Sequence, residues 1–147
     1  MNSQIKRISS SAKETKKIGE SFALIVSKNK TGALIIVLNG DIGAGKTTFT
    51  QGFAKGLGIK EKVTSPTFVL MKQFIINNGK FKKLYHLDCY RIVKPKEILS
   101  LGFKEIISNN SNVVLIEWAE NIKRYLPKDK TVISFDFIDE NTRNISS

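Results

Sequence analysis

The chain has 147 residues and a formal net charge of +11, with 24 Lys and Arg against 13 Asp and Glu. This length suits one domain with its own hydrophobic core, so we expect residues 1–147 to form a single domain. The single cysteine, Cys89, excludes an intramolecular disulfide, and no apolar run approaches the ~18 residues of a membrane-spanning helix, so we expect a cytoplasmic protein without membrane association.

The first predicted element is an amphipathic helix over about residues 12–27. Ser11 and Glu14 have the S-x-x-E spacing of a capping box. Behind them, apolar residues recur at helical spacing from Ile18 to Val26. The helix is therefore expected to begin directly after Ser11.

A strand, a glycine-rich loop and a second helix come next. Residues 33–38 are apolar on both faces, which is typical of a central strand in a parallel sheet. Residues 40–47, GDIGAGKT, have the G-x-x-x-x-G-K-T pattern, and a helix is expected from near Lys46 to about Leu57, closed by Gly58. Strand, loop and helix in this order form the context that a phosphate-binding loop requires.

The rest of the chain predicts further strands and short helices. Residues 68–76 and 80–87 read as the two strands of a hairpin, joined by the Asn-Asn-Gly turn at 77–79. Two short helices are expected over residues 97–103, with a break at Gly102, and over residues 119–125. Two further strands are expected over residues 113–116 and 131–138. The expected fold class is α/β: a three-layer αβα P-loop NTPase domain whose mostly parallel sheet carries an antiparallel hairpin.

The glycine-rich loop predicts binding of a nucleoside triphosphate. Gly43 and Gly45 allow the tight turn that aims successive N–H groups at phosphate oxygens, and the helix that follows adds its positive dipole. Lys46 is expected to bridge the β- and γ-phosphates, and the Thr47 hydroxyl to bind Mg²⁺. ATP and Mg²⁺ are the expected cofactors; GTP is not favoured, because no N/T-K-x-D-like guanine motif is present.

Two carboxylates follow apolar strands and are candidates for metal-dependent chemistry. Glu117 comes directly after the run at 113–116, which is hydrophobic enough to lie beside the strand of the loop, so it is favoured as the carboxylate nearest the metal. Asp88 ends a more amphipathic strand, and it could equally cap the next turn. The hydroxyls around Pro66 leave two alternatives open, a loop that contacts the γ-phosphate and an ordinary entry into a strand.

Four motifs together resemble one family. They are GDIGAGKTTF at 40–49, SPTF at 65–68, HLDCYR at 86–91 and LIEWAE at 115–120. In this order and spacing, over about residues 8–145, the chain resembles the TsaE (YjeE) family, the ATPase component of the bacterial machinery for tRNA threonylcarbamoyladenosine modification. The resemblance implies a slow ATPase that acts on the TsaB–TsaD complex, which transfers threonylcarbamoyl to the adenosine beside the anticodon. It leaves direct contact with tRNA open.

The resemblance also implies roles for single residues. Lys46, Asp88, Glu117 and Thr67 match its catalytic machinery, and Thr47 and Glu117 match its Mg²⁺ ligands. The implied nucleotide-binding residues are Ser11, Asp41, Ile42, Gly43, Ala44, Gly45, Lys46, Thr47, Thr48, Trp118, Glu120 and Arg143.

Several of these positions have a second interpretation from the residues alone. Trp118 matches a Trp beside the nucleotide, although a lone Trp is more often a core residue. Arg143 matches a position near the base or ribose, and could instead be a solvated charge on an edge strand. Ser65 and Thr67 match a switch-like loop near the nucleotide. For His86, the single histidine, we expect a structural or positioning role, because phosphoryl transfer depends mainly on positioning and charge stabilisation.

Two other function classes are open to this sequence. A small-molecule kinase would need an Arg-rich lid, and the four arginines of the chain form no such cluster. A nucleic-acid-binding module would fit the 15 Lys and Arg against 5 Asp and Glu in residues 1–88, although basic and aromatic residues do not interleave on one strand face. Scattered surface lysines without any ligand explain the same charge equally well.

Overall fold

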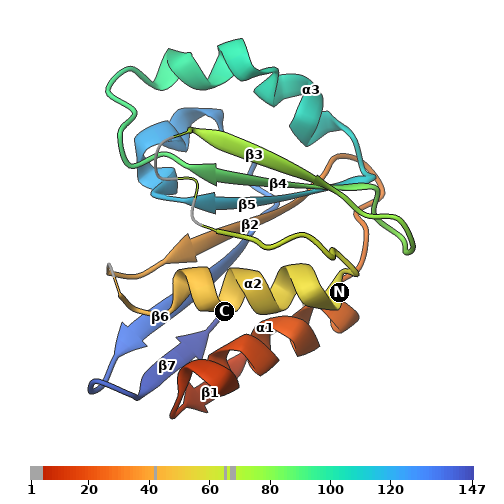
Figure 1. Ribbon diagram of the computed structural model, residues 1–147. Helices are drawn as coiled ribbons and strands as arrows, with labels where there is room; N and C mark the ends of the chain where they lie inside the picture. Colours follow the sequence, from red (N-terminus) through yellow and green to blue (C-terminus); the bar gives the residue numbers. More distant parts are fainter. Residues whose placement is uncertain (1–4, 42, 65, 67–68) are drawn as a thin grey trace. The chain divides into compact units, whose positions relative to one another are not determined.

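The structure is a computed structural model that describes residues 5–41, 43–64, 66 and 69–147. Within these residues the strands follow the order β1-β7-β6-β2-β5-β4-β3 in a mixed seven-stranded sheet (Figure 1). Residue contacts divide the chain into two compact units, one from Met1–Val26, Leu38–Ser65 and Val132–Ser147, the other from Ser27–Val37 and Pro66–Thr131. The predicted α/β fold class is confirmed.

Each predicted helix and strand has a counterpart in the structure. The strands are β1 (Lys6–Ser9), β2 (Leu34–Asn39), β3 (Met71–Ile75), β4 (Lys83–Asp88), β5 (Asn112–Glu117), β6 (Thr131–Phe137) and β7 (Arg143–Ser146). The α-helices are α1 (Ala12–Ile25), α2 (Lys46–Gly56) and α3 (Phe103–Ser108), and the 3-10 helices are η1 (Pro95–Leu101) and η2 (Ala119–Tyr125). None of the described helices is long and apolar enough to cross a lipid bilayer.

The structure adds elements that the sequence pattern did not predict. β1 and β7 have four residues each and pair antiparallel with one another, which two hydrogen bonds between Ile5 and Ser147 extend. Such short and mostly polar strands carry no clear period-2 pattern. The helix expected over 97–103 is the 3-10 helix η1, and α3 follows it where only a break was predicted, because Gly102 turns the chain at a φ of 78°.

In the first unit, α1 begins where the capping box predicts. The Ser11 hydroxyl accepts a hydrogen bond from the Glu14 backbone N–H at 3.0 Å. The Glu14 carboxylate reaches back to the N–H of Ser10 at 2.7 Å, one residue before the expected partner, and this backbone hydrogen bond lowers the pKa of Glu14 below its ordinary value. The side chains of Ser11 and Glu14 therefore both stabilise the start of α1.

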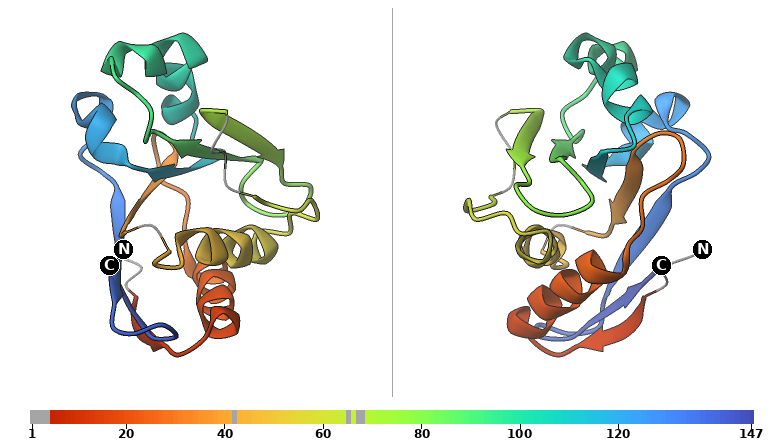
Figure 2. Two further views of the ribbon diagram at one scale, coloured as in Figure 1. Left: turned by 60° about the vertical axis from the view of Figure 1, so that its left-hand side comes forward. Right: turned by 90° about the vertical axis from the view of Figure 1, so that its right-hand side faces the viewer.

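The two long helices of the first unit lie side by side in close contact (Figure 2). A Cβ atom at Gly52 would lie 1.9 Å from the carbonyl oxygen of Lys16, and one at Gly19 would lie 2.2 Å from the carbonyl oxygen of Phe49. Glycine is therefore needed for this approach, and a cluster of phenylalanines fills the space beside it, formed by Phe22, Phe49, Phe53 and Phe135. The packing fixes α2, which carries Lys46 and Thr47 in its first turn.

The second unit contains the predicted hairpin and a parallel strand beside it. β3 and β4 pair antiparallel, and β4 pairs parallel with β5. The register of β4 and β5 sets Asp88 opposite Glu117. Two strands that end at an acidic residue therefore end side by side.

Candidate functional site

Glycines with positive φ angles give the glycine-rich loop of the first unit its shape. Gly40, Gly43 and Gly45 have positive φ angles of 156°, 83° and 98°, a region that other residues rarely adopt. Gly45 is the N-cap of α2 and provides no side-chain cap, so it leaves the first amide groups of the helix to other acceptors. This is the arrangement that an anion at a helix N-terminus uses.

Lys46 is folded back over this loop. Its side chain is buried, with 7% of the residue exposed, and Nζ donates a hydrogen bond to the carbonyl oxygen of Gly40 at 2.6 Å. Thr47 and Thr48 follow in the first turn of α2 and are half-buried. The ammonium group, the helix start and two hydroxyls are therefore held in one short segment.

Arg143, from the start of β7, also lies at the glycine-rich loop. Its Nη2 donates to the carbonyl oxygen of Gly43 at 3.0 Å, and its Nη1 donates to the carbonyl oxygens of Asp139 and Thr142. The guanidinium carbon is 4.8 Å from the ring centroid of Phe137, within cation–π range. Arg143 is thus not a solvated edge-strand charge, and β7 itself pairs with β1 on one side and β6 on the other.

The turn before β7 explains why Arg143 takes this place. The Asp139 carboxylate accepts hydrogen bonds from the backbone N–H groups of Asn141 and Thr142, each at 2.9 Å. The backbone hydrogen bond from Asn141 is the main cause that holds the pKa of Asp139 below its ordinary value. An Asp-anchored turn therefore presents the arginine to the loop.

In the second unit, His86 and Glu117 form a buried pair. Nε2 of His86 lies 2.8 Å from Oε2 of Glu117, and both residues are shielded from solvent. Within the described part of the chain, Nδ1 of His86 is buried and has no hydrogen-bond partner. We therefore place the ring proton on Nε2, where it donates to the carboxylate, because a proton on Nδ1 would be a buried donor without an acceptor. The expected positioning role of His86 agrees with this contact.

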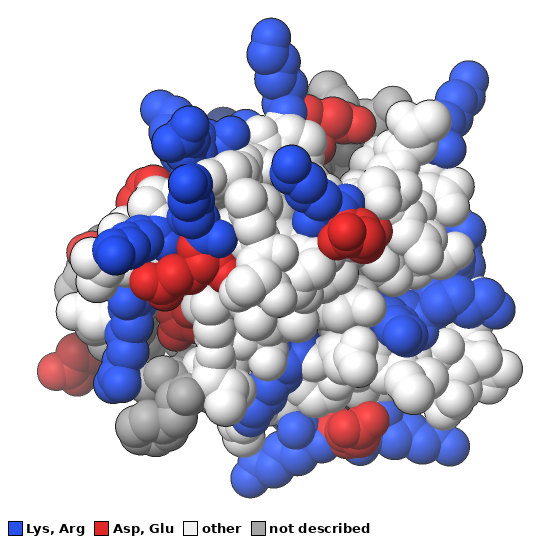
Figure 3. Space-filling model, turned by 90° about the horizontal axis from the view of Figure 1, so that it is seen from above, with Lys and Arg blue, Asp and Glu red and all other residues white. Residues whose placement is uncertain are grey.

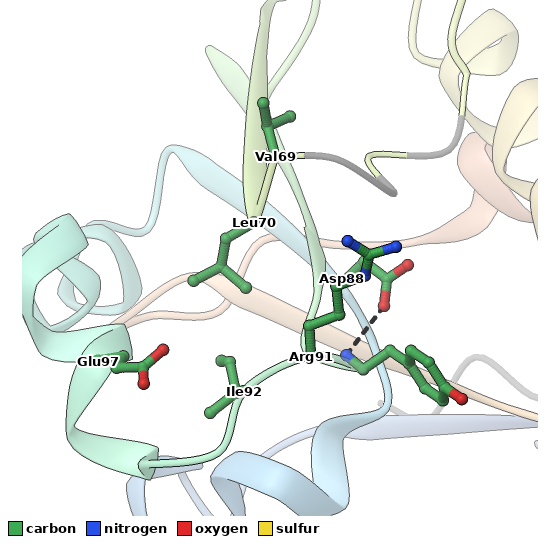
Figure 4. Close-up of a pocket in the computed structure, with 7 residues that line it drawn as sticks. Val69, Leu70, Asp88, Arg91, Ile92 and Glu97 are labelled. Carbon is green, nitrogen blue, oxygen red and sulfur yellow. Dashed lines mark hydrogen bonds between the residues drawn. The ribbon is translucent and has the colours of Figure 1, made fainter.

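Asp88 occupies a turn and also lines a cavity. Its Oδ1 accepts a hydrogen bond from the N–H of Tyr90 at 3.0 Å, so the turn-capping interpretation of Asp88 is observed. The cavity has a volume of about 210 Å³, and Figure 4 shows Glu97 projecting toward it from η1. It is lined by Val69, Leu70, Asp88, Tyr90, Arg91, Ile92 and Glu97. Asp88 therefore borders an accessible cavity whose lining includes the apolar side chains of Val69, Leu70 and Ile92.

The residues just after β4 and β5 are joined by contacts that the sequence did not reveal. Trp118 is half-exposed and has a φ of 58°, a costly value for a bulky side chain, and its ring centroid is 4.8 Å from that of Tyr90. Asn121 Nδ2 donates to the carbonyl oxygen of Cys89 at 2.9 Å, and the Cys89 N–H donates to the carbonyl oxygen of Glu117 at 3.0 Å. No local pattern marks Asn121 as a tether between these strand ends.

Burial makes the Cys89 thiol unreactive. It raises the pKa of Cys89 to about 12, and the negative charges of Asp88 and Glu120 add to the shift. The thiolate, which is the nucleophilic form, is therefore absent near neutral pH. Cys89 supports the turn through its backbone, and its protonated thiol is a poor nucleophile.

The predicted site residues fall into two groups. The first unit contains Ser11, Asp41, Gly43, Ala44, Gly45, Lys46, Thr47, Thr48 and Arg143, and the second contains Asp88, Glu117, Trp118 and Glu120. Ile42, Ser65 and Thr67 lie outside the described residues. The Ser11 hydroxyl caps α1, and Glu120 is exposed in the first turn of η2. Among the described residues, no three His, Cys, Asp or Glu side chains form a metal-binding group.

Comparison with known proteins gives a consistent result. The family of the threonylcarbamoyl adenosine biosynthesis protein TsaE matches residues 9–145. The tRNA threonylcarbamoyladenosine biosynthesis protein TsaE of Haemophilus influenzae is 38% identical over 130 residues, which are 88% of this chain and 79% of that protein. The protein of the same name from Treponema pallidum is 33% identical over 139 residues, 95% and 96% of the two chains. The crystal structure of YdiB from Bacillus subtilis matches with a TM-score of 0.76 at 34% identity, covering 99% of this chain and 85% of that one.

Proposed function

The chain belongs to the TsaE family, and from this premise we propose that it binds ATP with Mg²⁺ and hydrolyses the nucleotide slowly in support of tRNA threonylcarbamoyladenosine modification. The observation that carries the nucleotide part of the proposal is the glycine-rich loop. Its glycines at positive φ lead into α2, whose start has no side-chain cap, and Lys46 is folded over them. A nucleoside triphosphate would use all of these groups together.

The loop would hold the phosphates in three ways. Its N–H groups and those at the start of α2 would cradle the phosphate oxygens. Lys46 would exchange its contact with the carbonyl of Gly40 for the β- and γ-phosphates, whose negative charge is the better partner for an ammonium. Ser11, Asp41, Thr48 and Arg143 would complete the contacts, with Arg143 toward the base or ribose.

We propose Thr47 and Glu117 as the protein ligands of Mg²⁺. This cation keeps several water molecules and takes only one or two protein oxygens beside the phosphates, so a cluster of three acidic side chains is not required. His86 would hold the Glu117 carboxylate in one orientation through the contact at 2.8 Å. Bound Mg²⁺ would supply charge stabilisation for phosphoryl transfer, while Asp88 would position the attacking water. Trp118 and Glu120 would lie beside the nucleotide.

The proposed partner is the TsaB–TsaD complex. The relatives are named for tRNA threonylcarbamoyladenosine biosynthesis, which supports a partner from the same pathway. Hydrolysis would therefore serve to reset that complex between cycles. Thr67, in the segment after Thr64, is the proposed coupling residue, since a hydroxyl near the γ-phosphate could hold one conformation with ATP and release it with ADP.

Steady-state ATP hydrolysis with and without the purified complex tests the proposal. We expect slow turnover alone and faster turnover with the complex, and we expect Thr67→Ala to lose most of this stimulation while nucleotide affinity is retained. ATP turnover that is fast without the complex and unchanged when the complex is added would contradict the proposed partner. A phosphorylated small molecule formed in the absence of the complex would favour a kinase instead.

A further inference from the structure

Three segments of the second unit meet at the edge of the sheet where β2, β4 and β5 begin. The N–H of Lys82 donates to the carbonyl oxygen of Ser111 at 2.7 Å, and the N–H of Ala33 donates to the carbonyl oxygen of Ile107 at 2.8 Å. The side chain of Asn110 donates to the carbonyl oxygen of Lys30 at 3.4 Å. These contacts join residues 28–33, 76–83 and 107–112, which lie together at the right of Figure 1 and face the viewer in the right panel of Figure 2.

The ionisable side chains that the three segments contribute to this edge are all lysines. Its lysines are Lys28, Lys30, Lys80, Lys82 and Lys83, and we call this set the basic edge. The first four are exposed and Lys83 is half-buried. No Asp or Glu occurs at positions 21–40, 62–87 or 106–116, so the three segments contain no acidic residue. Figure 3 shows the face seen from above, where Lys and Arg side chains project into solvent and Asp and Glu side chains lie among them.

The chemistry of the basic edge fits a phosphate backbone better than a protein or a stacked base. All its cations are lysines, a residue type that protein interfaces use less than other surfaces do. The aromatic residue of these segments, Phe81, is buried, so it offers no platform for base stacking. The exposed amide side chains of Asn78 and Asn109 lie in the same segments and can donate to phosphate or sugar oxygens.

We propose that the basic edge binds the phosphate backbone of RNA without reading its bases. It lies at the opposite end of β4 and β5 from Asp88 and Glu117, about 17 Å along the strands at ~3.3 Å per residue. RNA bound at the edge would therefore leave the acidic strand ends accessible. The inference does not rest on ATP hydrolysis, because none of the five lysines belongs to the proposed nucleotide-binding residues.

The test is binding of a fluorescein-labelled RNA stem-loop to the full chain without nucleotide, measured by anisotropy between about 50 and 200 mM salt. We compare the wild type with a triple variant of the edge, Lys28→Gln, Lys80→Gln and Lys82→Gln. The matched control is Lys17→Gln, Lys96→Gln and Lys123→Gln, three exposed lysines outside the edge that remove the same charge. Thermal unfolding checks that both variants remain folded.

We expect the edge variant to bind the RNA at least about tenfold more weakly and to lose about 0.7 to 0.9 of salt slope for each phosphate contact removed. The control should stay within about twofold of the wild type. Absent RNA binding in the wild type, or equal losses in both variants, would overturn the proposal. So would an edge variant that keeps its RNA affinity but no longer binds the TsaB–TsaD complex, since the edge would then face a protein.

Discussion

The glycine-rich loop and the ends of β4 and β5 are two candidate sites built in different ways. In the loop the functional groups belong mainly to the backbone, and glycines at positive φ give that backbone its shape. At the strand ends the functional groups are side chains, and the pair of His86 and Glu117 joins residues 31 positions apart. The first site is made by a local turn, and the second by the register of two paired strands.

This difference predicts different sensitivities to substitution. A backbone site fails when its glycines or Lys46 are replaced, because most of its other groups are backbone N–H groups. A side-chain site loses its activity when the carboxylate is replaced, and it becomes less active when a residue that orients the carboxylate is replaced. Substitutions in the two regions should therefore separate nucleotide binding from hydrolysis.

The largest expected effect on nucleotide binding is that of Lys46→Ala. The substitution removes the one ammonium group folded over the loop, and a hydrogen bond to a charged group contributes about 1.5–3 kcal/mol. We expect ATP affinity to fall about 100-fold in calorimetric titration. Lys55→Ala, an exposed lysine on the same helix, is the matched control and should bind ATP as the wild type does. Normal ATP affinity in Lys46→Ala would remove the loop from the proposed site.

Glu117→Gln should affect hydrolysis far more than binding. The amide keeps an acceptor for His86 but loses the charge, so we expect turnover to fall by about 10²- to 10³-fold with little change in ATP affinity. Glu117→Ala should show the same loss and also a lower melting temperature, because it leaves the buried Nε2–H without an acceptor. If turnover survives in Glu117→Gln and disappears in Asp88→Ala, the roles of the two acids are reversed.

Arg143→Gln tests whether the loop depends on a side chain from β7. The variant loses the contact with the carbonyl of Gly43, and a net hydrogen-bond contribution of about 1 kcal/mol corresponds to an ATP affinity some five- to tenfold lower. Arg124→Gln is the control, since that arginine contacts Tyr125 in η2. Equal affinities in the two variants would mean that the loop is shaped by its backbone alone.

Trp118 allows the strand ends to be observed directly. It is the single tryptophan, it is half-exposed, and its ring contacts Tyr90 at 4.8 Å. We expect its emission to change when Mg-ATP is added, because a ligand beside the ring alters its exposure. Tyr90→Leu should change the emission of the free protein and serves as a reference for the ring environment. An emission spectrum that is constant at saturating nucleotide would place Trp118 away from the bound ligand.

The smallest expected effect concerns Cys89 and appears only at high pH. Up to about pH 8 the thiol is protonated in both the folded and the unfolded chain, so its contribution does not vary. Between pH 9 and about 12 the unfolded chain forms the thiolate while the folded chain keeps the thiol, so the free energy of unfolding should decrease. Urea unfolding of the wild type and Cys89→Ala across this range isolates the effect from other titrating groups. Parallel pH profiles would contradict the raised pKa.

Much of the fold could be predicted because its signals are local. The capping box placed the start of α1, the apolar run placed β2, and the turn at 77–79 placed the hairpin of β3 and β4. β1 and β7 were not predicted, because they are short and because their pairing joins the first and the last residues of the chain. The 3-10 geometry of η1 and η2 also depends on packing beyond their own sequence.

By itself, the sequence determined the glycine-rich loop, its lysine and the acidic ends of two strands, because glycine conformation and strand hydrophobicity act over a few residues. Only the tertiary structure decided that His86 holds Glu117, that Arg143 reaches Gly43, and that lysines from three segments gather at one edge. Each of these contacts joins residues far apart in the chain. Their proximity follows from strand register and helix packing, which no single segment of sequence encodes.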